Sequence, residues 1–167
     1  MPIASTLAQA GRPRNFPMLQ IAQSAFDKLR AHGESTYPDE SCGVLLGTIS
    51  EDSRIVTEAL PLGNTAETRR NRYRIAPLDL IRAEKAARLA GWEILGFYHS
   101  HPDHLAEPSA TDLAEAHWLG YSYVITSVAN GGATQTRSFF LSGEREEEKH
   151  FTSEGIRLDP GSSVVGL

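Results

Sequence analysis

The chain has 167 residues, of which 40% are hydrophobic and 22% are charged, a composition typical of a single globular domain. Sixteen basic and 21 acidic side chains give a net charge of -5, which disfavours a nucleic-acid partner. The only cysteine, Cys42, excludes an internal disulfide and every zinc site built from several cysteines. Neither a signal peptide nor an apolar stretch of the ~20 residues that span a bilayer is found, so we expect a cytoplasmic protein without membrane contact.

The chain divides into three parts by pattern. Residues 1–17 show no periodicity and are predicted to be a flexible N-terminal extension. Residues 18–152 carry helix and strand signals without a linker or repeat, which predicts one domain. Residues 153–167 are expected to be a C-terminal tail.

Apolar spacing predicts three helices and several strands within the domain. The expected helices, in chain order, cover residues 22–33, 77–90 and 109–119. The expected strands cover residues 42–49, 54–62, 72–75, 92–99, 121–128 and 134–141. Strands mixed with helices in this order indicate a three-layer α/β domain with a mixed central sheet flanked by helices.

Two histidines end the fourth predicted strand. Residues two apart on a strand point to the same face, so His99 and His101 direct both imidazoles towards one point. Pro102 cannot continue the ladder, so the chain must leave the sheet just after His101. Taken alone, however, a His-x-His pair is only weak evidence for a metal site.

A carboxylate follows at the start of the next helix. Pro108 and Ser109 begin that helix and place Asp112 in its first turn, where it could be a third ligand. Two imidazoles and one carboxylate suit Zn²⁺ and leave a fourth position for water, as in catalytic zinc sites. Ser109 and Asp112 also fit an ordinary helix cap. His104 is a weaker rival for the third ligand position.

Hydrolysis at such a metal also needs a proton acceptor. Asp39 and Glu40 both stand just before the first buried strand, and the residues alone do not decide between them. Cys42 follows closely and is expected to be a small buried hydrophobe, although a thiol near the site could also be reactive.

The combined pattern resembles the JAMM (MPN+) zinc metalloprotease family. Glu40 precedes SCGVLLG, and residues 99–112 follow the signature H-x-H-P-x5-P-S-x-x-D at every position. The resemblance extends over about residues 18–142 and is greatest to the compact prokaryotic members. It implies a cytidine-deaminase-like MPN fold.

The resemblance also implies the chemistry. His99, His101 and Asp112 would hold one Zn²⁺, Glu40 would be the general base, and Ser109 would support the water or the oxyanion. The implied activity is hydrolysis of a peptide or isopeptide bond by a zinc-bound water. The implied substrate is a ubiquitin-like or sulfur-carrier protein with a Gly-Gly tail. The Cys- and His-bearing insertion of the eukaryotic deubiquitinases is missing after Asp112.

Other functions compete with this interpretation. A non-catalytic MPN scaffold is the main alternative, but such members lack the ligands that are present here. A DNA-repair-associated branch fits the acidic charge poorly, and a nucleoside deaminase would need a Cys pair that this chain lacks. The sequence leaves the oligomeric state open, a homodimer included.

Arginines alternate in the segment that precedes the second helix. If residues 72–75 form a strand, Arg70, Arg72 and Arg74 would face one way and Tyr73 the other. We expect this strip either to dock an acidic ubiquitin-like partner or to protect a strand edge from pairing.

Overall fold

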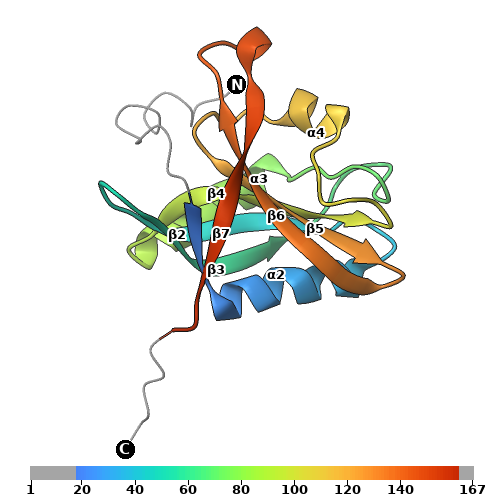
Figure 1. Cartoon of the computed structure of the whole chain (residues 1–167), viewed down its shortest axis with the longest axis horizontal. Helices are drawn as coiled ribbons and strands as arrows, with labels where there is room; N and C mark the ends of the chain where they lie inside the picture. The colour runs from blue at the N-terminus through green and yellow to red at the C-terminus, as the bar shows by residue number, and fades with distance from the viewer. Residues whose placement is uncertain (1–17, 162–167) are drawn as a thin grey trace, which may run out of the picture.

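The computed structural model describes residues 18–161 (Figure 1). The strands are β1 (Met18–Ala22), β2 (Cys42–Ile49), β3 (Arg54–Leu62), β4 (Glu93–Pro102), β5 (Ser122–Ala129), β6 (Gly132–Ser142) and β7 (His150–Asp159). The helices are α2 (Gln23–Thr36), α3 (Pro77–Leu89), α4 (Ala110–Glu115) and a short 3₁₀ turn, η1 (Glu146–Glu148). None of the helices in the described range is long and apolar enough to cross a membrane.

One mixed sheet contains all seven strands, in the order β1-β3-β2-β4-β5-β6-β7. β4 and β5 are parallel, and β2 pairs antiparallel with both β3 and β4. The sheet curls until β1 lies parallel to both β3 and β7, which closes it. The predicted α/β class with a mixed central sheet is therefore confirmed.

Hydrophobic side chains pack on both faces of the central strands. On β2, Leu45 joins the cluster that contains Leu29 of α2, whereas its neighbour Val44 joins the cluster that contains Ala83 of α3. Successive residues of a strand point to opposite faces, so α2 and α3 cover opposite sides of β2. Figure 1 shows α2 lying across one side of the sheet.

A buried ion pair joins strands that are distant in the sequence. The Arg54 guanidinium of β3 pairs with Glu154 of β7, and each side chain is no more than 3% exposed. Glu154 Oε1 also accepts hydrogen bonds from Ser122 Oγ (2.5 Å) and Ser138 Oγ (2.7 Å). The charge of Arg54 is thus compensated inside the protein, as a buried charge requires.

The structure corrects several predicted boundaries. The tail expected from residue 153 is wrong in its first part, because residues 153–159 continue β7 and pair with β6 and β1. Residues 72–75 do not form the expected strand, and the helix expected at 109–119 ends at Glu115. The extension predicted for residues 1–17 lies outside the described residues.

Candidate metal and catalytic site

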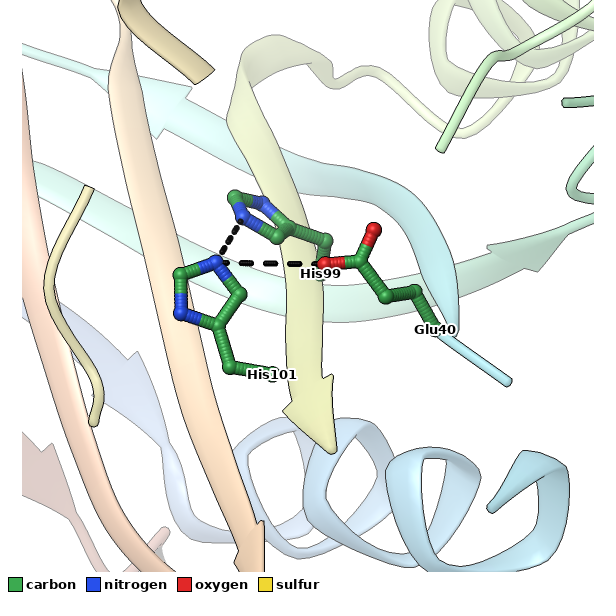
Figure 2. Close-up of side chains that lie close together, drawn as sticks. All are labelled: Glu40, His99 and His101. Atoms are coloured by element: carbon green, nitrogen blue, oxygen red, sulfur yellow. Dashed lines mark hydrogen bonds and ion pairs between the residues drawn. The ribbon is translucent and has the colours of Figure 1, made fainter. Parts of the chain in front are cut away.

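Two histidines from the end of β4 form the centre of the site. Both are buried, and His99 Nε2 lies 3.1 Å from His101 Nε2 (Figure 2). His101 Nδ1 lies 2.7 Å from the carbonyl oxygen of Leu105, which fixes the ring so that Nε2 faces His99. Two ring nitrogens this close are well placed to share one cation.

Asp112 comes to the same point from α4. Its Oδ2 lies 3.0 Å from His101 Nε2 and 3.4 Å from His99 Nε2. Burial opposes ionisation, but hydrogen bonds to His101 and His99 hold the pKa of Asp112 well below its usual value. Burial lowers the pKa of His99. Burial also acts to lower the pKa of His101, but hydrogen bonds to Asp112 and to the Leu105 carbonyl outweigh it and raise that pKa. Two imidazoles and an anionic carboxylate are ligand types that suit Zn²⁺.

The start of α4 sets the orientation of Asp112. Ser109 caps the helix: its Oγ accepts a hydrogen bond from Asp112 N (3.0 Å), and its own backbone N–H donates to Asp112 Oδ2 (2.9 Å). The capping interaction expected from the sequence is thus present. The same carboxylate oxygen also faces the histidines, so the cap and the candidate metal site share one side chain.

Glu40 reaches the site because β2 and β4 are paired. Cys42 pairs with His99, and the antiparallel register continues one residue further through the hydrogen bond from Ser100 N to Ser41 O (3.2 Å). Ser100 Oγ in turn accepts from Ser41 N (2.8 Å) and Ser41 Oγ (3.0 Å). This register brings Glu40 opposite His101, with 3.9 Å between Glu40 Oε1 and His101 Nε2.

Glu40 is the buried member of the two candidate bases. Its side chain is 4% exposed, and burial raises its pKa to about 8. Asp39 instead pairs with Arg69 at 3.6 Å and is 39% exposed. A group that titrates near neutral pH is well suited to accept and return a proton. The geometry therefore favours Glu40 over Asp39, a choice that the residue types alone left open.

The remaining candidates are not members of this cluster. His104 is exposed, and its carbonyl oxygen accepts a hydrogen bond from Ser127 Oγ (2.6 Å). His117 is also exposed and lies 3.9 Å from a carboxylate oxygen of Glu146. Cys42 is fully buried, and burial raises the pKa of its thiol to about 12. None of these three side chains is placed to act in the cluster around His99 and His101.

Asn64 and Tyr73 were missed by sequence reasoning. Asn64 Nδ2 donates to the carbonyl oxygens of Glu40 (3.1 Å) and Arg72 (3.0 Å). Tyr73 stacks on the ring of His99, with 4.5 Å between the ring centroids. The alternating pattern of residues 72–75 already placed Tyr73 opposite the arginines, but no periodic signal marks a loop asparagine that bonds to a distant backbone.

The arginine strip needs correction. Residues 72–75 do not form a strand. Instead, backbone and side-chain hydrogen bonds join Arg72 and Arg74 to Asn64 and Thr65. Arg72 pairs with Glu115 of α4 at 3.2 Å, and Arg69 pairs with Asp39. The charge of the strip residue Arg72 is therefore partly compensated, as is that of the neighbouring Arg69, and this weakens the case for a docking strip.

A pocket of about 310 Å³ is lined in part by Tyr73, the residue that stacks on His99. Aromatic and aliphatic side chains make up most of its lining (Tyr73, Ile75, Leu80, Phe97, Trp118 and Tyr123), and Arg74, Glu115 and His117 add polar groups. Since Tyr73 also stacks on His99, the pocket and the candidate metal site share a wall. A side chain near a reacting bond could therefore enter this pocket.

Comparison with known proteins identifies the class to which this site belongs. Residues 22–142 match the family of prokaryotic homologs of the JAB domain. The chain is 40% identical over 113 residues to the desampylase of Haloferax volcanii, covering 65% of this chain and 80% of that protein. It is 31% identical over 148 residues to a probable TtuB-protein conjugate cleaving protease of Thermus thermophilus, covering 87% and 93%.

A solved structure agrees with this class. Protein DSY2949 of Desulfitobacterium hafniense superimposes with a TM-score of 0.75 at 29% identity, covering 86% of this chain and 94% of that one. The chain belongs to the prokaryotic JAB-domain family, within the JAMM/MPN group that its sequence resembles. It is a JAMM-type hydrolase, and the predicted enzymatic class is confirmed.

Proposed function

We propose that the protein is a zinc-dependent peptidase that cleaves a peptide or isopeptide bond at the C-terminus of a ubiquitin-like or sulfur-carrier protein. The convergence of His99 Nε2, His101 Nε2 and Asp112 Oδ2 carries this proposal. These three atoms would hold one Zn²⁺, whose Lewis acidity polarises an amide carbonyl and lowers the pKa of water.

The histidine pair fits a metal, and the neighbouring carboxylate fits a base. If both imidazoles are neutral and both Nε2 atoms carry a lone pair, neither nitrogen can donate a hydrogen bond to the other. A cation between them would bind both lone pairs. Within the described part of the chain, Glu40 Oε2 is buried and has no hydrogen-bond partner. A buried carboxylate oxygen beside two imidazoles is suited to receive a proton from water.

Glu40 would move the proton in this reaction. Its ligand atom lies within 4.8 Å of those of both histidines, close enough to serve water bound between them. The raised pKa allows the carboxylate to accept a proton from the attacking water and the resulting acid to give it to the leaving amine. Ser109, at the end of α4 that presents Asp112, would orient the water or the developing oxyanion.

The substrate class rests on the relatives and on the pocket. One relative is named as a desampylase and the other as a protease that cleaves conjugates of the protein TtuB. A tail ending in Gly-Gly brings no bulky side chain to the reacting bond, and a larger apolar side chain upstream would suit the pocket lined in part by Phe97 and Trp118. We therefore favour a ubiquitin-like protein with a Gly-Gly tail as the substrate. The cytoplasmic location expected from the sequence stays a prediction.

Mass spectrometry of defined substrates tests this function. Ubiquitin-like proteins ending in Gly-Gly, either extended at the C-terminus or conjugated to a lysine, would be incubated with the enzyme before and after chelation. We expect cleavage after the second glycine, loss of cleavage with the chelator and its return with Zn²⁺. Cleavage that survives complete metal removal would contradict the proposal.

A further inference from the structure

The side chain of Asn64 uses its whole hydrogen-bonding capacity. Its Nδ2 donates to Glu40 O (3.1 Å) and Arg72 O (3.0 Å). Its Oδ1 accepts from the backbone N–H groups of Ala66 (3.0 Å) and Arg74 (3.1 Å). A primary amide offers two donors and an oxygen with two lone pairs, so all four capacities are used. Such a fully bonded side chain fixes the segments that it joins.

Glu40 depends on this loop because it lies outside the sheet. β2 begins at Cys42, so the backbone of Glu40 has no partner in the strand ladder. Its N–H donates instead to Arg69 O (2.6 Å), and its carbonyl accepts from Asn64. Both backbone groups of Glu40 are therefore held by the segment 64–69.

The same loop also borders the other side of the site. Arg74 N and Arg72 O flank Tyr73, and both are bonded to Asn64. Tyr73 stacks on His99 and lines the pocket. One side chain thus connects the segment that carries Glu40 with the segment that contacts a candidate metal ligand.

We infer that Asn64 is a positioning residue that sets the carboxylate of Glu40 opposite His101. The inference rests on the proposed role of Glu40 as general base. Without the bond from Asn64 Nδ2, the carbonyl of Glu40 loses its fixed partner, and the backbone can rotate the side chain away from His101. Displacement of a reacting group by a fraction of an ångström to one ångström is costly in catalysis.

The substitution Asn64→Asp removes the donor function of the Asn64 side chain and keeps its acceptor function. A carboxylate can still accept from Ala66 N and Arg74 N, but it can donate neither to Glu40 O nor to Arg72 O. We expect kcat to fall roughly 10–100-fold, as for other supporting residues, while KM and zinc content stay close to wild type. Thr65→Val is the matched control, because it removes a loop hydrogen bond to Arg74 O (3.0 Å) without touching Glu40.

A double-mutant cycle with Glu40→Gln decides whether Asn64 acts through Glu40. In that background Asn64→Asp should change kcat by less than about twofold, because the group it positions is already disabled. Hydrogen exchange at the amides of Ala66 and Arg74 reports whether the loop keeps its fold. An equal loss in both backgrounds, a loss confined to KM, or wild-type activity of Asn64→Asp would each overturn the inference. Wild-type activity of Glu40→Gln alone would instead refute the proposed function.

Discussion

Glu40 and His101 lie opposite each other where β2 and β4 approach the site, with 3.9 Å between Glu40 Oε1 and His101 Nε2. The neighbouring pair, Ser41 and Ser100, is fully internal and bonded through both backbone and hydroxyl groups. The position of Glu40 is therefore determined by the pairing of two strands and by the loop that holds its backbone.

Glu40→Gln should keep zinc and lose activity by roughly 10²–10⁴-fold, the usual contribution of a general base. The amide preserves the shape of the side chain but cannot accept a proton. Asp39→Asn is the control, since Asp39 pairs with Arg69 and is partly exposed. Kinetics combined with elemental analysis would check this prediction. Loss of zinc in Glu40→Gln would show that Glu40 is a ligand.

His101→Ala and Asp112→Ala should each lose both zinc and activity, because each removes one of the three converging donor atoms. His104→Ala should keep both, since His104 is exposed and lies outside the cluster. Metal content after dialysis is the measurement. Stoichiometric zinc in a variant that lacks both His99 and His101 would refute the ligand assignment.

Cys42 should resist alkylation in the native protein. Burial raises the pKa of its thiol to about 12, so the thiol stays protonated at neutral pH and only the thiolate is reactive. Incubation with iodoacetamide at pH 7.5, roughly one unit below the ordinary thiol pKa, followed by mass spectrometry would test this. Rapid native labelling, or inactivation by peroxide that Cys42→Ser prevents, would show that the thiol is accessible.

Glu154→Ala should lower the free energy of unfolding by about 3–5 kcal/mol, because it leaves the buried charge of Arg54 without its carboxylate. Glu58→Ala offers a comparison, since Glu58 pairs with Lys28 at 2.6 Å on the surface. That pair should contribute only about 0–1 kcal/mol. Equal effects of the two substitutions in urea unfolding would contradict the importance of the buried pair.

Gly96→Ala should destabilise the protein by about 1–3 kcal/mol or more, since a methyl group must be forced into a packed sheet. A Cβ at Gly96 would lie 2.1 Å from the carbonyl oxygen of Ser122 on β5. Gly63→Ala is the matched control, with no atom within 4 Å of the added carbon. Thermal unfolding of both variants would measure the difference, and a neutral Gly96→Ala would show that β4 and β5 can separate at low cost.

The site could be predicted from the sequence where its residues are near one another or follow strand periodicity. His99 and His101 share a strand face, and Pro102 and Pro108 mark the turn that leads to Asp112, so local rules bring these residues together. Glu40 could be placed only by family resemblance. Its position depends on the register of β2 against β4, which connects residues about sixty positions apart and leaves no local signal.

The parts of the fold that the sequence did not predict also depend on contacts between residues far apart in the chain. Apolar runs identified β2 and β4, and the turn after β2 identified β3 as its hairpin partner. β7 instead carries mostly exposed and half-buried residues with little apolar content, which made residues 153–159 resemble a tail. It is held in place by pairing with β6 and β1 and by a few inward side chains, namely Phe151, Ile156 and the ion-paired Glu154. Similarly, residues 72–75 alternate like a strand but bond to the side chain of Asn64 in place of a neighbouring ladder.

The pairing of β1 with β7 has a consequence for how the chain acquires its structure. The proposed metal ligands and the proposed base all precede residue 113, yet the sheet closes only after β7 has been synthesised, because β7 fills the gap between β6 and β1. Contacts between the first and last strands are slow to form, since a long loop must close before they gain any stability. During translation the candidate metal ligands would thus emerge from the ribosome well before their supporting sheet is complete.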